Sequence, residues 1–341
     1  MSESAPPQHT LLPNETILGG DFTQLFLTHP DLNILDMSSI GSGKTTKALH
    51  HIEWLVNHGH VVLMILPSYQ LLEEKVGEIS CQDQTMIFRG RPQKGMCPRY
   101  ESEKRAFLPY LSPCQGCLQR CNYMEQKKRI KNIKHGFAIF TVRHNLPTVL
   151  ELLKQRVTII IDDVSLDSVI NQKYTNYLDA VSAYASRFND MPNIQNFIRS
   201  LRVDTGEMIQ ASYELMRDEI CNEEEKLVEH IRTDLRDGKE IPNQIGFFSL
   251  LWALRKGKCV RNLGEEFEEH NLDTYKEHRI IYISSTPGAL ETRETSPPDI
   301  VNKSLMEMLG QYVTISNPAE PNDNWLFLVV NRCHGREVKF T

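Results

Sequence analysis

The sequence predicts an α/β fold built on a parallel sheet, into which a cysteine-rich segment and a long helical segment are inserted. Three observations predict it. Residues 33–65 alternate between an apolar run, a glycine-containing turn, a helix-spaced pattern and a second apolar run, which is the order expected where a parallel sheet begins. Four cysteines crowd into residues 97–121, and residues 165–278 are rich in charged, helix-spaced segments. At 341 residues with 40% hydrophobic content, the chain can form two or three lobes.

Runs of apolar and β-branched residues mark the expected strands, and helical spacing of apolar residues marks the expected helices. The strands are expected within residues 33–37, 58–68, 137–142, 157–161 and 279–290. The helices are expected within 46–57, 69–78, 127–133, 147–154, 178–189, 207–236 and 246–256. In the tail we expect a helix at 300–309, a strand at 325–330 and no further strand-and-helix unit.

The stretch Asn33–Thr46, NILDMSSIGSGKTT, predicts a phosphate-binding turn between a strand and a helix. Glycines at such a turn take backbone conformations that other residues avoid. The N–H groups of the turn and the positive end of the helix attract a polyphosphate, Lys44 adds a point charge, and the Thr45 hydroxyl can ligate Mg²⁺. We therefore expect nucleotide contacts from Ser39, Ile40, Gly41, Ser42, Gly43, Lys44, Thr45 and Thr46.

The spacing of this turn departs from the common pattern G-x-x-x-x-G-K-[ST], which would place a glycine where Ser38 stands. The shorter core G-x-G-K-[ST] remains. A glycine-rich turn that binds nothing is the alternative interpretation.

The run VTIIIDD at 157–163 predicts the second part of the same site. Its apolar residues form an interior strand, and the carboxyl end of such a strand faces the nucleotide crevice in an open α/β sheet. Asp162 is expected to hold Mg²⁺ through water, and Asp163 is expected to orient and deprotonate the attacking water. A simple strand end is the alternative, and the presence of Lys44 is what favours the catalytic interpretation.

Cys97, Cys114, Cys117 and Cys121 predict a metal centre. In a reducing compartment, such clustering indicates metal more readily than disulfides. One wide gap followed by a tight triplet can supply four thiolates to a tetrahedral zinc ion or to an iron–sulfur cluster, and the spacing does not choose between them. Four unrelated buried thiols are the alternative.

The bulk properties exclude some classes of protein. A formal net charge of −6 provides no global basic field, so any nucleic-acid contact must come from a local patch such as KKRIKNIK at 127–134, which is otherwise a solvated helix face. The sequence contains no run of 18 apolar residues, and its N-terminus lacks the features of a signal peptide. We expect a cytoplasmic protein without membrane contact, or a nuclear one if the source is eukaryotic.

In the content and order of these motifs, the chain resembles the N-terminal motor half of the iron–sulfur superfamily-2 helicases, the XPD/DinG group. The resemblance covers roughly residues 30–300. It is carried by SSIGSGKTT (38–46), VVLMILPSYQLLEE (61–74), FRGRPQKGMC (88–97), CQGCLQRC (114–121), HGFAIFTVRHNL (135–146), IIIDDVS (159–165) and ISSTPGAL (283–290).

The resemblance implies a RecA-like domain interrupted by a four-cysteine cluster lobe and a helical arch. Residues 1–15 are rich in Ser and Pro and are expected to be disordered. The RecA-like domain is expected in three parts, 16–87, 127–164 and 279–341, with the cluster lobe at 88–126 and the arch-like insertion at 165–278.

The resemblance also assigns roles to individual residues. Lys44 and Thr45 would serve ATP and Mg²⁺, Asp162 the metal ion and Asp163 the water. The four cysteines would hold a 4Fe–4S cluster, with zinc as the alternative, and Ser284, Ser285 and Thr286 would couple the ATP state to DNA. The implied function is ATP-driven translocation on single-stranded DNA with unwinding at a duplex junction.

Two departures from the family pattern shape the expectation. Asp163 stands where the family has a glutamate that is longer by one methylene, and misplacement of about 1 Å can cost about 100-fold in rate. The sequence after about 310 is too short for the second RecA-like domain that carries the arginine finger, so we expect either a truncated helicase or a half that works with another chain. Two other hypotheses compete with this one. The first is an accessory protein that binds nucleotide and DNA without unwinding, and the second is an unrelated zinc-containing P-loop ATPase or kinase.

Overall fold

The computed structural model describes residues 16–18, 21–28, 32–36, 38, 41–98, 121–164, 169, 171–175, 178–201, 206–239, 245–264, 266–270, 275, 277–283 and 312–316. Segment 1–15 and the tail candidates at 300–309 and 325–330 lie outside these residues. No helix in the described part of the chain is long and apolar enough to cross a bilayer.

The main sheet confirms the predicted α/β fold. Among the described residues it has eight strands in the order β1-β11-β2-β10-β6-β3-β5-β4, and every neighbouring pair is parallel. The strands are β1 (Thr16–Leu18), β2 (Asn33–Asp36), β3 (Val61–Ile65), β4 (Thr85–Ile87), β5 (Phe137–Thr141), β6 (Thr158–Asp162), β10 (Arg279–Ile283) and β11 (Tyr312–Ser316).

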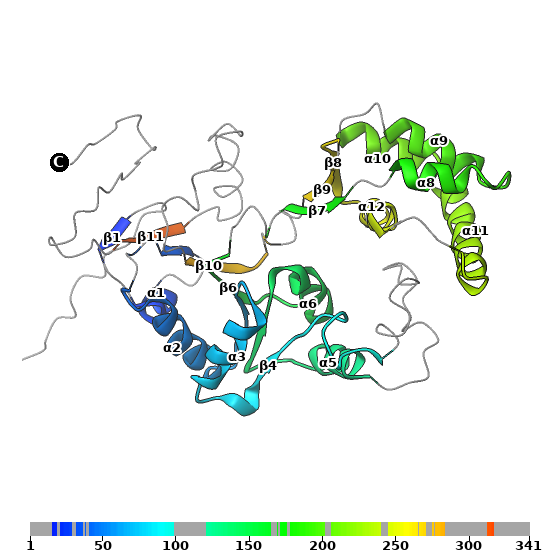
Figure 1. The fold of residues 1–341 in the computed structure, drawn as a ribbon. Helices are drawn as coiled ribbons and strands as arrows, with labels where there is room; N and C mark the ends of the chain where they lie inside the picture. The colour runs from blue at the N-terminus through cyan, green and yellow to red at the C-terminus, as the bar shows by residue number, and fades with distance from the viewer. Residues whose placement is uncertain are drawn as a thin grey trace, which may run out of the picture.

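Helices cover both faces of this sheet, because alternate residues of its strands enter two separate cores. Ile34, Val62 and Met64 belong to the core under α1 (Phe22–Thr28), α2 (Lys44–Asn57) and α3 (Tyr69–Gly77). Leu35 and Leu63 belong to the core under α5 (Asn122–Lys131) and α6 (Leu146–Leu153). The result is a three-layer arrangement, in which α1, α2 and α3 follow one side of the sheet (Figure 1).

Between β6 and β10 the chain forms a second lobe with its own core. Figure 1 shows the helices of this lobe grouped together with a small sheet. The helices are α8 (Leu178–Ala185), α9 (Pro192–Leu201), α10 (Gly206–Leu215), α11 (Arg217–Arg236) and α12 (Ile245–Arg255). The predicted helices at 178–189, 207–236 and 246–256 are confirmed, with the longest divided into α10 and α11, and α9 is an additional helix.

The lobe also contains a small sheet that the sequence analysis did not predict. Three antiparallel strands, β7 (Asn171–Thr175), β9 (Glu266–His270) and β8 (Cys259–Asn262), form a sheet in that order. Val260 and Phe267 enter the core of the lobe, while Lys258 Nζ donates to Glu269 Oε1 at 2.5 Å. Glu, Asn and Lys are weak strand formers, so the local pattern concealed strands that antiparallel pairing stabilises.

The tail also contributes a strand that the sequence analysis did not predict. β11 lies parallel between β1 and β2, and its residues pair with Asn33–Asp36 from Tyr312 to Ile315. The other neighbour of β2 is β10. The strand β2, which precedes the predicted phosphate-binding turn (the P-loop), therefore has two partners, and both come from residues after 278.

His51 on α2 is buried among aromatic rings on one face of the sheet. Its ring lies 6.1 Å from that of Phe22 and 5.7 Å from that of Phe26, and its Nδ1 lies 3.0 Å from Thr23 Oγ1. Burial, assisted by the positive charge of Arg279, lowers the pKa of His51 from 6.5 to about 3. The folded chain therefore holds this imidazole in its neutral form.

We expect His51 to make the free energy of unfolding depend on pH. The unfolded chain binds a proton at this residue below pH 6.5 while the folded chain does not, so the stabilisation is present above 6.5 and is lost as pH falls toward 3. Between pH 7.5 and 5 the loss should reach about 2 kcal/mol. Urea unfolding of the wild type and His51→Phe at both pH values measures it. Exposed His50, changed to Gln, is the control, and an equal pH dependence in wild type and His51→Phe would contradict the assignment.

Candidate functional site

Three neighbouring strands, β2, β10 and β6, end together at one edge of the main sheet. In the register of these strands, Ile283 of β10 is paired with Asp36 on one side and with Asp162 on the other. The predicted phosphate turn follows β2, and the two predicted catalytic aspartates stand at the end of β6. Parallel pairing therefore brings both halves of the predicted site to the same edge.

The turn after β2 has the backbone that the sequence predicts. Gly41 and Gly43 have φ values of 81° and 75°, a region that favours glycine because it lacks Cβ. α2 begins at Lys44, one or two residues before the expected start, and Gly43 precedes it without a side-chain cap. The first N–H groups of a helix without a side-chain cap can bind an anion. Ser39 and Ile40 lie outside the described residues, and Thr46 is exposed.

Lys44 lies inside this turn. Its side chain is only 7% exposed, and its amine donates to the carbonyl oxygen of Ser38. Burial lowers the pKa of Lys44, whereas the negative charges of Asp36, Asp163 and Asp162 act in the opposite direction. The cation is thus held at the edge of the sheet among three carboxylates.

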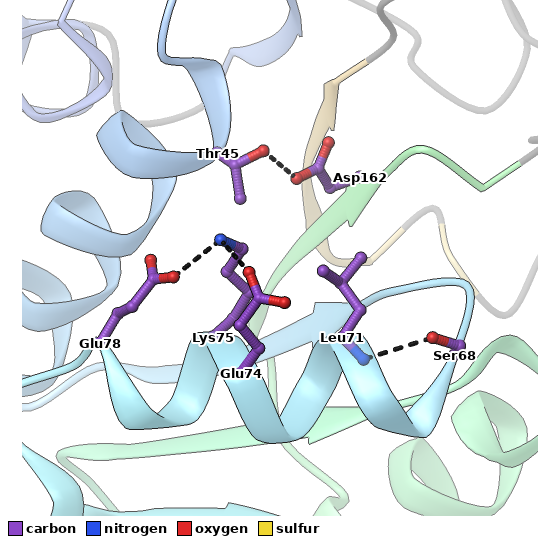
Figure 2. A network of polar contacts seen from close by, with 7 residues as sticks. All are labelled: Thr45, Ser68, Leu71, Glu74, Lys75, Glu78 and Asp162. Carbon is purple, nitrogen blue, oxygen red and sulfur yellow. Dashed lines mark hydrogen bonds and ion pairs between the residues drawn. The ribbon is translucent and has the colours of Figure 1, made fainter.

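Thr45 and Asp162 join the two predicted motifs directly. Thr45 Oγ1 donates to Asp162 Oδ2 at 2.7 Å, although the residues are 117 positions apart in the chain (Figure 2). Asp162 is 3% exposed. Burial raises the pKa of Asp162 from 3.8 to about 6, which the hydrogen bond from Thr45 partly offsets. A divalent cation beside this pair would stabilise the carboxylate that burial destabilises.

Asp163 differs from Asp162 in both environment and backbone. Its side chain is exposed, and its φ of 53° places it in the left-handed region, which Asp tolerates better than most residues. Its N–H donates to the carbonyl oxygen of Ile283 at 3.3 Å. The backbone therefore turns at the edge of the sheet immediately after the buried carboxylate.

The residues of this edge fit a nucleotide and Mg²⁺. Ser38 Oγ and Ser42 Oγ are buried and have no hydrogen-bond partner among the described residues, and buried polar atoms without partners are rare outside binding sites. Polyphosphate oxygens would accept from both hydroxyls. The Thr45 hydroxyl and the Asp162 carboxylate are the hard oxygen ligands that Mg²⁺ prefers.

Sequence reasoning missed Asp36, which is 1% exposed at the end of β2. Its Oδ1 accepts from Ser38 N–H at 2.9 Å, and its charge favours the ammonium form of Lys44. The signal was available, because NILD ends an apolar strand with an aspartate in the same way as TIIID does. Ser284, Ser285 and Thr286 follow β10 directly but lie outside the described residues.

The structure describes two of the four predicted cysteine ligands. Cys97 and Cys121 are both buried. Their neighbours are joined, because Tyr123 N–H donates to Met96 O at 3.1 Å and Asn122 Nδ2 donates to Gly95 O at 3.0 Å. Cys114 and Cys117 lie outside the described residues, and no group of three or more potential metal ligands occurs among those described. The two buried thiols fit half of the donor set of a zinc or iron–sulfur centre.

Three basic side chains lie against the rings of Tyr69 and Tyr123. The Arg91 guanidinium carbon is 5.2 Å and Lys127 Nζ is 5.5 Å from the centroid of the Tyr123 ring. Arg89 lies 5.5 Å from the ring of Tyr69 and pairs with Glu73 at 2.6 Å. We call Tyr69, Arg89, Arg91, Tyr123 and Lys127 the arginine–tyrosine cluster.

Comparison with known proteins finds similarity of fold. No protein-family model and no curated protein sequence matches the chain. Among solved structures, the chain is similar to an XPD helicase, with a TM-score of 0.48, 14% identity and coverage of 84% of this chain and 59% of that one. It is similar to a truncated XPD, with a TM-score of 0.47, 14% identity and coverage of 85% and 96%. For apo XPD the TM-score is 0.41, with 12% identity and coverage of 84% and 55%. The chain thus spans 59% of the first of these relatives and 55% of the third.

Proposed function

We propose that the chain is an ATP-binding and ATP-hydrolysing motor domain of the helicase type that acts on DNA. The observation that carries the proposal is the contact between Thr45 Oγ1 and Asp162 Oδ2 at 2.7 Å. It joins the end of a G-x-G-K-T turn to an aspartate that ends a buried parallel strand, which is the arrangement by which P-loop enzymes hold Mg²⁺. Thr45 and Asp162 would hold Mg²⁺, which would supply stabilisation of the negative charge that develops on the phosphoryl group.

Each residue of this edge then has a defined task. Lys44 would leave the Ser38 carbonyl to contact the terminal phosphates, and the Ser42 hydroxyl would donate to a phosphate oxygen. Thr45 and Asp162 would hold the cation. Asp163, exposed at the edge, would orient the attacking water, and its short side chain predicts slow turnover.

Binding of single-stranded DNA is supported by the arginine–tyrosine cluster. Arginine and lysine side chains can contact a phosphate backbone, and Arg91 and Lys127 lie against the ring of Tyr123, which is itself buried. Tyr123 follows Cys121 by two residues in the chain, so a lobe held by the four cysteines would extend this surface. The order of motifs along the chain, which resembles that of the XPD/DinG group, supports the same assignment.

The test is the rate of ATP hydrolysis by the purified chain with and without a single-stranded oligonucleotide. We expect slow hydrolysis that requires Mg²⁺ and rises on addition of DNA. Hydrolysis that is indifferent to DNA would instead indicate a P-loop ATPase of another kind. DNA binding without hydrolysis would indicate an accessory protein.

We propose that Cys97, Cys114, Cys117 and Cys121 hold a 4Fe–4S cluster. Protein purified without oxygen should contain about four irons per chain and absorb broadly near 400 nm. Cys117→Ser should lose the metal, while Cys221→Ser, a change on α11, should not. One zinc ion and no colour would replace the cluster with a tetrahedral zinc site, and unchanged metal in Cys117→Ser would contradict the four-thiolate assignment.

A further inference from the structure

A solvent-open cavity of about 400 Å³ lies at the edge of the main sheet opposite the P-loop. The last turn of α5, the connection that follows it and the first residue of β5 line it, through Arg129, Asn132, Ile133, Lys134, His135 and Phe137. Phe137 begins β5, whereas Asp162 ends β6, and strands of five residues place such ends roughly 15 Å apart. The cavity is therefore separate from the nucleotide site.

The rim of this cavity is cationic. Arg129, Lys134 and His135 are exposed, and no carboxylate is among the described residues that line the cavity. Positive groups around a concave surface, without acidic neighbours, concentrate anions at that surface. The chain as a whole carries a net charge of −6, so this local excess of positive charge is a feature of the cavity and not of the overall composition.

The lining of the cavity is partly apolar. The guanidinium carbon of Arg129 lies 5.0 Å from the centroid of the half-buried Phe137 ring, and Ile133 is also half-buried. Aromatic rings and guanidinium planes are the surfaces on which nucleobases stack. The volume lies within the range of small-molecule sites, roughly 300–1,000 Å³.

The backbone that carries these side chains is fixed in place. Buried Gly136 has a φ of 57°, and a Cβ at this position would meet Val56 O at 3.1 Å. Phe137 N–H donates to His60 O at 3.2 Å, and Gln155 Nε2 donates to Ile133 O at 3.4 Å. A connection held this way loses little conformational freedom on binding, which favours affinity.

We propose that this cavity is a second nucleotide-binding site, which takes a nucleoside phosphate. Arg129 and Lys134 bind the phosphate, and the base lies on the surface made by Phe137 and the Arg129 plane. The nucleoside phosphate has two sources, a free mononucleotide or one nucleotide of a single strand. The inference does not depend on hydrolysis at the P-loop.

The test uses the full chain with Lys44→Ala, so that the P-loop does not contribute, and two fluorescent probes, labelled AMP and a labelled deoxythymidine 12-mer. The site variant is Arg129→Gln/Lys134→Gln. The matched control is Lys128→Gln/Lys131→Gln, which removes the same charge from exposed positions of α5 that do not line the cavity. Circular dichroism and thermal unfolding of both variants verify that the chain is folded.

We expect the site variant to bind at least one probe about tenfold more weakly, with the control within twofold of the parent. Loss of AMP binding identifies a free mononucleotide as the source, and loss confined to the 12-mer identifies a strand. For the 12-mer, the slope of log affinity against log salt should fall by about 0.7, because the contact to one phosphate is removed.

Four results would overturn the proposal. Equal losses in the site variant and the control would show a diffuse charge effect of α5. Unchanged binding in the site variant, or no binding of either probe by the parent, would show that the basic residues serve only the negative end of the helix. Competition by inorganic phosphate as effective as that by unlabelled AMP would show a plain anion site. Failure of the P-loop proposal would be seen separately. In that case Lys44→Ala would bind ATP with the same affinity as the wild type.

Discussion

Lys44→Ala is expected to lower the affinity for ATP by about 100-fold or more. The amine is buried within the turn, and in the proposed function it is the point charge that would meet the terminal phosphates. Hydrogen bonds from a charged group are each worth about 1.5–3 kcal/mol, and a factor of 100 corresponds to about 2.7 kcal/mol. Titration of the chain with ATP and Mg²⁺ by calorimetry measures the loss.

The matched control for this change is Lys47→Ala, which removes the same charge one turn further along α2. It should leave ATP affinity within about twofold. Lys44→Ala should also unfold at a lower temperature at pH 8, because Asp36 and Asp162 stay buried without their nearby cation. Normal ATP affinity in folded Lys44→Ala would refute the phosphate-binding turn.

Asp162→Asn is expected to lower Mg²⁺-dependent ATP hydrolysis by about 10³-fold while making the protein without nucleotide more stable. The amide still accepts a hydrogen bond from Thr45 but is a poor ligand for Mg²⁺. The raised pKa of Asp162, about 6, means that the buried carboxylate is destabilising once it is ionised. The folded chain holds the Asp162 proton more tightly than the unfolded chain does. The contribution of Asp162 to the free energy of unfolding therefore declines as pH rises from about 4 to 6. Neutralising the residue should therefore raise the free energy of unfolding at pH 8 by about 1–3 kcal/mol.

Asp163→Asn separates the two carboxylates. Its side chain is exposed, so its replacement should leave the free energy of unfolding unchanged, while hydrolysis falls about 100-fold and nucleotide affinity is retained. Urea unfolding at pH 8 and a steady-state hydrolysis assay distinguish the variants. If Asp162→Asn and Asp163→Asn lowered the free energy of unfolding equally, the prediction that the buried, ionised Asp162 destabilises the fold would be wrong.

The parts of the site that local chemistry dictates could be predicted from the sequence. Gly41 and Gly43 adopt the backbone that their residue type allows, and TIIID forms the buried strand that its β-branched residues favour. The meeting of Thr45 with Asp162 follows from the rule that the carboxyl ends of parallel strands share one edge. These predictions needed only short-range pattern and one topological rule.

Features that depend on distant partners were missed. β7 and β9 carry Asn, Lys and Glu, and only their mutual pairing makes them strands. The sequence YVTIS at 312–316 is β-branched, but its place between β1 and β2 could not be deduced from its own residues. The cavity beside Phe137 likewise arises from the way in which the chain turns between α5 and β5.

The partners of β2 determine when this strand can pair during synthesis on the ribosome. β3, β4, β5 and β6 can pair with one another once residue 162 has emerged, whereas β2 must wait for β10, which begins at Arg279. Pairing over such sequence separation is slow, and unpaired strand edges promote aggregation while they wait. Nascent chains released before residue 279 should therefore hold a folded half-sheet without a formed phosphate turn, so that nucleotide capture becomes possible only late in synthesis.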